Sequence, residues 1–198
     1  MNPEMRRVVL EAAKAARGGW SERDVASLAE STRGLRCDDA ELARLLALPV
    51  ADHGHREEVF TTDPSFHASV FALAEGETIP LHDHPGLDVI SKVLRGLIRV
   101  RTYEWIDASS LVAGDRGVVV LGVEDDALVL RKWPGTLHTI TAIEATAFLD
   151  LFAPYYEDEI RLCRYYVADS AAGRRLASRR DASAPVVLRI VTWEEARR

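Results

Sequence analysis

Three histidines have the residue type and the spacing of a metal site. His82 and His84 are separated by one residue in the segment IPLHDHPG at 79–86, and His138 follows in PGTLH at 134–138. Side chains two positions apart on an extended segment point to the same side, so the first two imidazoles face together. Because imidazole binds iron, zinc, copper and nickel, we predict that the three histidines bind one metal ion. The alternative is that they are surface or core histidines bonded to the backbone.

Short apolar segments separated by turn residues surround these histidines. The clearest is 97–105, in which arginine and glutamate alternate with apolar residues. Many short strands at regular spacing indicate an antiparallel sandwich or barrel. The strands expected from this pattern are 59–61, 66–73, 89–94, 97–105, 116–123, 127–132, 137–141, 147–152, 163–167 and 186–192.

Residues 3–48 have a helical period instead. The first helix ends at Gly18 and Gly19, and two later helices begin at the capping signatures Ser21 with Asp24 and Asp38 with Glu41. We expect these helices to pack on the outside of the sheet. The predicted division is therefore a helical extension at 1–56 and a barrel with a C-terminal strand at 57–198.

Composition narrows the class of protein. The formal charge of −6 argues against nucleic acid as the main partner, because phosphate binding requires a basic face. The start of the chain is polar rather than like a signal peptide, and no apolar run is long enough to span a membrane. Two cysteines are too few for a disulfide framework. We expect a cytoplasmic monomer without a membrane or nucleic-acid partner.

The glycines around the histidines match a known pattern. Gly76 stands six residues before His82, Gly96 follows the pair, and Gly135 stands three residues before His138. This spacing resembles the two metal motifs of the cupins. The resemblance implies a mainly β fold, the double-stranded β-helix or jelly-roll barrel, with an N-terminal helical extension here.

Further motifs resemble a narrower family, the cysteamine (2-aminoethanethiol) dioxygenases and plant cysteine oxidases. Besides the histidine segments they are SKVLRG at 91–96, YEW at 103–105, LDLFAPYY at 149–156 and RLCRYY at 161–166. The resemblance covers roughly 57–168. It implies a non-haem Fe(II) enzyme that adds both atoms of O2 to a small thiol, either an aminothiol or an N-terminal cysteine, and forms a sulfinic acid.

Carried over by position, the resemblance assigns the site residues. His82, His84 and His138 would be the iron ligands. Asp150 and Tyr156 would be a catalytic or substrate-binding pair. Cys163 and Tyr165 match a Cys-x-Tyr sequence that can lie near the active site, where a thioether between them is an open possibility.

Several residues have two readings. Asp150 has apolar neighbours on both sides, so its carboxylate must find partners; it could be satisfied by the backbone or a ligand histidine, or it could bind a substrate amine. Tyr156 could be a wall residue or a hydroxyl donor. We expect Asp83 and His67 to be structural, and Lys92 to lie on a solvated face.

Asp88 departs from the family, which usually has a small neutral residue at that position. A carboxylate there could be a fourth metal ligand or could hold a substrate ammonium group. With Asp150 it would favour thiols that carry an ammonium group. Two other functions therefore remain open: a cupin that uses manganese or nickel on a non-thiol substrate, and a metal-binding or effector-binding cupin without turnover.

Overall fold

The strands form a five-stranded sheet and a six-stranded closed barrel. The computed structural model describes residues 2–51, 54–132, 136–154, 163–169 and 185–198. The sheet has the order β1-β2-β9-β4-β7 and the barrel the order β10-β11-β6-β5-β8-β3. The strands are β1 Arg56–Asp63, β2 Phe66–Leu73, β3 Thr78–Asp83, β4 Asp88–Arg95, β5 Leu97–Asp107, β6 Val112–Gly122, β7 Leu128–Leu130, β8 Thr136–Ala142, β9 Thr146–Ala153, β10 Arg164–Ala168 and β11 Val186–Val191.

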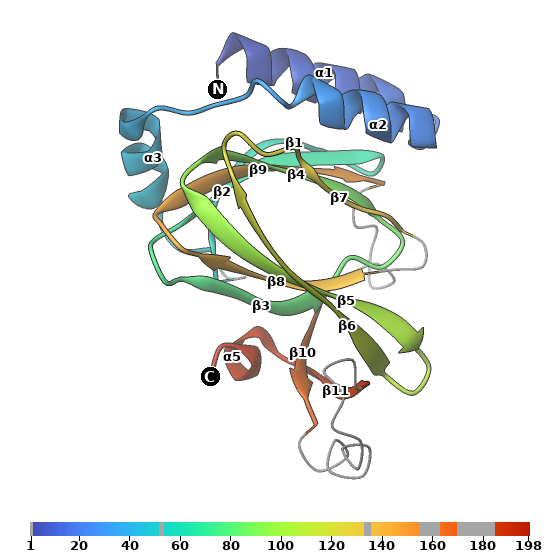
Figure 1. Ribbon diagram of the computed structural model, residues 1–198. Coiled ribbons are helices and arrows are strands. Elements are labelled where there is room, and N and C mark those ends of the chain that lie inside the picture. Colours follow the sequence, from blue (N-terminus) through green and yellow to red (C-terminus); the bar gives the residue numbers. More distant parts are fainter. Residues whose placement is uncertain (1, 52–53, 133–135, 155–162, 170–184) are drawn as a thin grey trace.

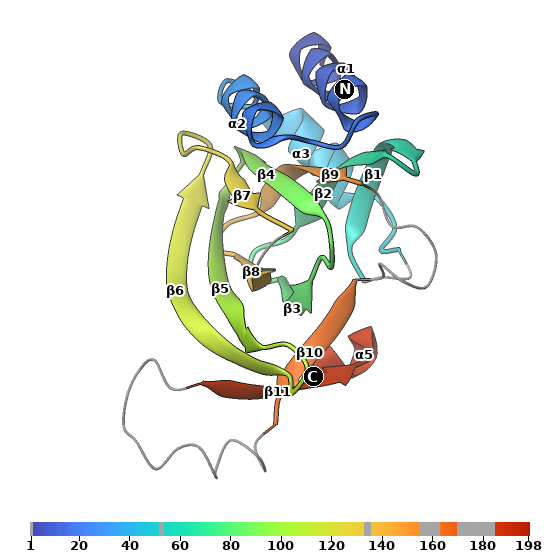
Figure 2. The same cartoon turned by 90° about the vertical axis from the view of Figure 1, so that its right-hand side faces the viewer.

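The helices lie at two places on this framework. They are α1 Pro3–Ala16, α2 Glu22–Ser31, α3 Asp39–Leu46 and α5 Trp193–Ala196. Figure 1 shows α1 and α2 over one face of the five-stranded sheet, with β3, β5, β6 and β8 of the barrel beyond its other face and α5 beyond these strands. Figure 2 shows the long β5–β6 hairpin curving along one side of the molecule. The predicted mainly β class and the cupin double-stranded β-helix with N-terminal helices are confirmed.

Some predicted boundaries were wrong. The strand expected at 116–123 begins earlier, at Val112, because 112–115 pair with the far end of β5 through two register shifts. The strand expected at 127–132 is reduced to Leu128–Leu130. The capping signatures are confirmed: Ser21 and Asp24 form a reciprocal capping box, and the Asp38 side chain accepts a hydrogen bond from the Glu41 N–H.

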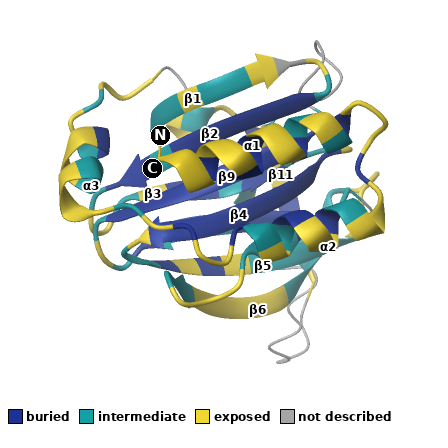
Figure 3. Ribbon diagram, turned by 90° about the horizontal axis from the view of Figure 1, so that it is seen from above, coloured by how far each residue is buried: buried dark blue, intermediate teal, exposed yellow. Residues whose placement is uncertain are grey.

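The helices cover the outer face of the sheet with apolar side chains. Val8, Leu28 and Leu45 from the three helices share one buried cluster with Ile90 and Leu149 from β4 and β9. Figure 3 shows α1 and α2 crossing above strands that are buried along most of their length. Burying a side chain of this size contributes about 1.5–3 kcal/mol. The helices and the sheet share one core, so no separate core marks a boundary at residue 56. The predicted division there stays a prediction.

The side chains of β9 alternate between the helix-covered face of the five-stranded sheet and the interior between this sheet and the barrel. Leu149 and Leu151 join the helix-side cluster, whereas Phe148 packs with Ile98 and Ile140 of the opposite sheet. Successive side chains of a strand point to opposite faces. Asp150 therefore shares the interior face with Phe148.

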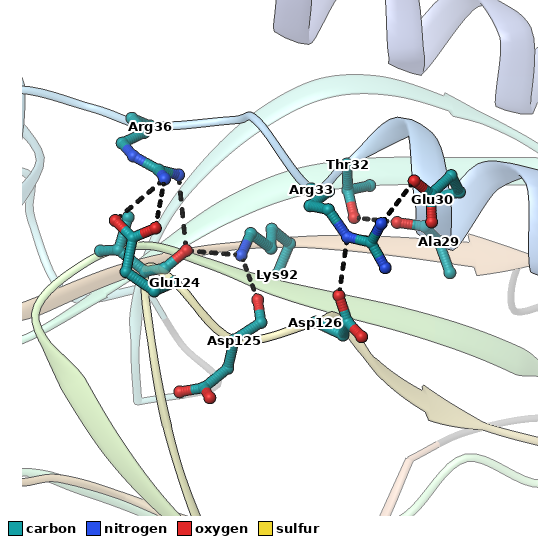
Figure 4. Close-up of polar contacts among 10 residues, drawn as sticks. Ala29, Glu30, Thr32, Arg33, Arg36, Lys92, Glu124, Asp125 and Asp126 are labelled. Carbon is teal, nitrogen blue, oxygen red and sulfur yellow. Dashed lines mark hydrogen bonds and ion pairs between the residues drawn. The ribbon is translucent and has the colours of Figure 1, made fainter.

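Polar contacts join the segment after α2 to the turn between β6 and β7 (Figure 4). Arg33 pairs with Asp126 and Arg36 with Glu124. Beneath them the Lys92 ammonium group donates to the carbonyl oxygens of residues 123 and 125. The predicted solvated face for Lys92 was wrong, because the side chain is fully buried where the helices cover β4.

Candidate metal centre

The three predicted histidines converge at the end of β3. His82 lies directly opposite His138 on the neighbouring strand β8, and His84 comes one residue after β3 ends. The ring centroid of His82 lies 4.2 Å from that of His138 and 4.8 Å from that of His84. One nitrogen of each ring lies within 4.8 Å of one nitrogen of the other two. Two adjacent strands and one loop residue thus bring the imidazoles together.

The protein environment keeps these imidazoles neutral. Burial lowers the pKa of His82, and it lowers the pKa of His84 and His138 further, with additional repulsion from the neighbouring histidines. The Nδ1 of His82 lies 2.8 Å from the carbonyl oxygen of Pro80, so we assign the proton to Nδ1. This leaves the lone pair of Nε2 for a metal. Neutral imidazole is the form that binds metal ions.

The geometry fits a divalent metal ion. Nitrogens in adjacent positions at about 2.1 Å from one ion lie about 3.0–3.4 Å apart. Since the three nitrogens here lie within 4.8 Å of one another, the rings would have to close in by less than about 2 Å to share an ion. The Nδ1 of His138 is buried and has no hydrogen-bond partner in the part of the chain that the structure describes. Among the described residues, no carboxylate or thiol joins the cluster. The donor set is therefore three neutral nitrogens, which leaves coordination positions for other ligands.

Asp83, between two of the histidines, ties β3 to β10. Its carboxylate is 3% exposed and accepts a hydrogen bond of 2.8 Å from the Tyr166 hydroxyl and one of 2.8 Å from the Arg164 guanidinium group. Arg164 lies directly opposite Asp83 in the β3–β10 pair. Asp83 thus has the structural role expected for it. The contacts with Arg164 and Tyr166 were not anticipated, because their segment lies some eighty residues later.

Asp88 lies apart from the histidines. Its carboxylate is fully buried, accepts a hydrogen bond of 3.0 Å from the Lys132 N–H, and lies 3.2 Å from the Arg131 guanidinium group. Asp88 has the same strand parity as Ile90, which belongs to the helix-side cluster. The structure does not bring Asp88 into the histidine cluster, so its predicted roles as fourth ligand or ammonium contact stay predictions without geometric support.

Asp150 lies on the interior face of the five-stranded sheet, and its carboxyl group has a raised pKa. It faces Ser69 of β2 on one side and Ser91 of β4 on the other. Burial raises the pKa of its carboxyl group to about 7, against the hydrogen bond from Ser91, and the charge of Glu57 adds to the rise. A group with this pKa can hold or release a proton near neutral pH.

Tyr165 lies beside the metal ligands, and its hydroxyl group is hydrogen-bonded to Cys163. Tyr165 is directly opposite His82 across the β3–β10 pair, with ring centroids 6.0 Å apart. Burial raises the pKa of the Tyr165 hydroxyl, as does its hydrogen bond with Cys163. Tyr156 lies outside the described residues, so its predicted role stays a prediction.

Sequence reasoning missed several residues next to the site. The ring centroid of Phe152 lies 5.4 Å from that of His84 and 5.5 Å from that of His67. His67 itself is bonded to Thr62 and Glu57, as expected of a structural histidine. Ser69 could have been found from its alternation with His67 along β2, which places both on the interior face.

Comparison with known proteins supports the resemblance seen in the motifs. The profile of the family described as PCO_ADO matches residues 54–195. Plant cysteine oxidase 2 of Arabidopsis thaliana is 32% identical over 109 residues, which are 51% of this chain and 40% of that protein. The 2-aminoethanethiol dioxygenase of Homo sapiens is 32% identical over 167 residues, covering 67% of this chain and 60% of that protein.

One relative is matched over most of its length. The probable 2-aminoethanethiol dioxygenase of Dictyostelium discoideum is 30% identical over 161 residues, covering 74% of this chain and 72% of that protein. The chain spans less than two thirds of the Arabidopsis and human relatives. Among the described residues, none of the helices has the length and apolar character needed to cross a membrane. On the profile match and this coverage, the chain belongs to the PCO_ADO family.

Proposed function

We propose that this protein is an iron(II)-dependent thiol dioxygenase that converts a small aminothiol, or an N-terminal cysteine, into its sulfinic acid with O2. The observation that carries the proposal is the cluster of three neutral imidazoles from His82, His84 and His138. The names of the relatives, cysteine oxidase and 2-aminoethanethiol dioxygenase, support the thiol as substrate. The overall reaction is balanced, because both oxygen atoms end on sulfur and no other reductant is needed.

The donor set suits this reaction. His82, His84 and His138 would hold the ion, and because all three are neutral, its full charge remains to attract a thiolate. A ferrous ion bound there would supply adjacent positions for thiolate and O2 and the redox chemistry between them. The hydrogen bond from His82 to the Pro80 carbonyl oxygen would fix the orientation of one ligand ring.

Other side chains would position the substrate and exclude water. Phe152 forms an apolar wall against His84. Asp150, on the interior face, could accept hydrogen bonds from a substrate ammonium group or hold a proton. Tyr165 would border the ligand His82, and we propose that Tyr156 is a substrate-pocket residue as the family motif implies.

Product analysis tests the proposal. Protein loaded anaerobically with iron is mixed with a pool of thiols and then with O2, and mass spectrometry is used to find a thiol that gains two oxygen atoms. His82→Ala should lose bound iron and product together. His67→Gln serves as control, because it changes a buried histidine outside the cluster and should retain iron. No O2 uptake with any thiol, or unchanged turnover by His82→Ala, would refute the assignment.

Metal analysis separates this proposal from the use of manganese or nickel on another substrate. That reading relied on Asp88 as a fourth ligand, and Asp88 is instead held by Arg131 and Lys132.

We also propose that the protein acts as a cytoplasmic monomer on a small molecule, without nucleic acid or membrane. Light scattering of the purified protein tests the oligomeric state.

A further inference from the structure

A polar row crosses the interior face of the five-stranded sheet. Ser69, Asp150 and Ser91 lie side by side on β2, β9 and β4, each directly opposite the next. The row on one side of them is apolar and contains Phe71 and Phe148, whose rings stack at 5.4 Å. Three polar side chains in one row of an otherwise apolar interior must find hydrogen-bond partners there.

The row on the other side contains Phe152, and this row leads to the metal centre. Phe152 lies two residues after Asp150 on the same face and contacts the ring of His84. Residues two apart on a strand are about 6.6 Å apart. The polar row is therefore one row of side chains away from the residues that touch the candidate metal ligands.

Two atoms of the polar row have no partner. Ser69 is fully buried and Asp150 is 6% exposed. The Ser69 hydroxyl oxygen and Asp150 Oδ1 are both buried and make no hydrogen bond, to each other or to another group of the described chain. Ser91 is directly opposite Asp150 on β4, and its side-chain hydrogen bond lowers the pKa of the Asp150 carboxyl group. Ser69 and Asp150 are directly opposite one another in the β2–β9 pair, so the two unpartnered atoms belong to neighbouring side chains.

A cation with several donors would satisfy both of these atoms. Among the described residues, the buried carboxylates of Asp88 and Asp83 each have an arginine partner, whereas Asp150 has no ion pair with a lysine or arginine. A buried carboxylate without such a partner is costly. An ammonium group carries three N–H donors, so it can bond to a carboxylate oxygen and a hydroxyl oxygen at once. It also supplies the positive charge that the buried Asp150 carboxylate lacks.

We infer that Ser69 is a further substrate-binding residue, whose hydroxyl oxygen and Asp150 Oδ1 together bind the ammonium group of an aminothiol. Ser91 holds the carboxylate from the opposite side and leaves Oδ1 free for the substrate. This inference deepens the proposed function and rests on it, because the ammonium group belongs to the thiol that is oxidised. It makes Ser69 a determinant of preference among thiols rather than a metal ligand.

Binding under anaerobic conditions tests the inference without requiring turnover. Two probes are titrated calorimetrically into the full-length iron-loaded protein: cysteamine, and 1-propanethiol, in which a methyl group replaces the ammonium group. The variants are Ser69→Ala and, as a matched control, Ser110→Ala, which removes an exposed serine hydroxyl from the β5–β6 turn. Ser69→Ala removes a hydroxyl without a partner and should fold as well as the unaltered protein.

The expected result is a change in one probe alone. Ser69→Ala should weaken cysteamine binding about tenfold or more, as expected for a lost hydrogen bond to a charged group, and should leave 1-propanethiol binding within about twofold. Ser110→Ala should change neither. Equally weakened binding of both probes would mean that Ser69 acts only in packing. Unchanged binding of both probes would mean that the Ser69 hydroxyl bonds only to water. Either result overturns the inference.

Steady-state kinetics separate the proposed thiol dioxygenase function from the inference about Ser69. If aminothiols are oxidised, Ser69→Ala should raise KM for cysteamine by the same factor and leave kcat nearly unchanged. If the iron-loaded protein oxidises no thiol, the proposed function fails, whereas the calorimetric comparison still decides whether Ser69 and Asp150 bind ammonium.

Discussion

Replacing Asp150 by asparagine should stabilise the metal-free protein at alkaline pH. Burial raises the pKa of Asp150 from 3.8 to about 7, so the folded state holds this proton more tightly than the unfolded chain. The stability due to that proton is present below about pH 4 and is lost as the pH rises through about 7. One pKa unit corresponds to about 1.4 kcal/mol, so ionising Asp150 in the folded protein costs up to about 4 kcal/mol.

Asparagine has the same shape and no charge, so it avoids this cost. Above pH 7, Asp150→Asn should raise the free energy of unfolding by about 1–4 kcal/mol, and near pH 4 the two proteins should differ by less than about 1 kcal/mol. Urea unfolding at several pH values measures both. A bound metal would favour the carboxylate and reduce the difference, so the comparison uses metal-free protein.

The control is Asp126→Asn, which neutralises an exposed carboxylate paired with Arg33 and should produce no such pH-dependent gain. A constant difference between Asp150→Asn and the unaltered protein across this pH range would refute the reasoning. So would a loss of stability at alkaline pH, because it would mean that the folded protein stabilises the charged form.

Two further changes test contacts around the metal centre. Asp83→Asn should lower the free energy of unfolding by about 1–3 kcal/mol, because it weakens the hydrogen bonds from Tyr166 and Arg164 to a buried carboxylate while Arg164 stays partly solvated. Urea unfolding of this variant and of the control Asp126→Asn measures the loss. An equal loss of stability in the two variants would contradict the prediction. Gly54→Ala should displace Trp193, because an added Cβ would lie 1.9 Å from the indole ring and the backbone φ is +83°; a lower melting temperature and altered tryptophan fluorescence are expected, and an unchanged protein would contradict the packing.

The metal ligands could be predicted because their arrangement is mostly local. His82 lies near the end of β3 and His84 only two residues further along the chain, so only His138 must arrive from elsewhere. The alternation of β9 likewise fixes which residues share a face with Asp150. These inferences need the period of a strand and nothing about its distant neighbours.

The partners of charged residues could not be predicted in the same way. Lys92 was expected on a solvated face because lysine side chains usually lie there, but helices from the first part of the chain cover that face and bury it. Asp88 looked close to the site because it follows His84 by four residues. Its position depends on the strand pairing and on Arg131 and Lys132, which lie more than forty residues later.

The proposed metal ligands and the proposed ammonium-binding residues lie on different sheets. His82 and His138 belong to neighbouring strands of the barrel, whereas Ser69 and Asp150 belong to neighbouring strands of the five-stranded sheet. Ser69 and Asp150 are not members of the histidine cluster, although Phe152 of β9 contacts the ring of His84. Substitutions of Ser69 or Asp150 should therefore change which thiol is bound while the histidine cluster stays intact. Substitutions that loosen the Asp83 connection between β3 and β10 should weaken metal binding for every thiol alike.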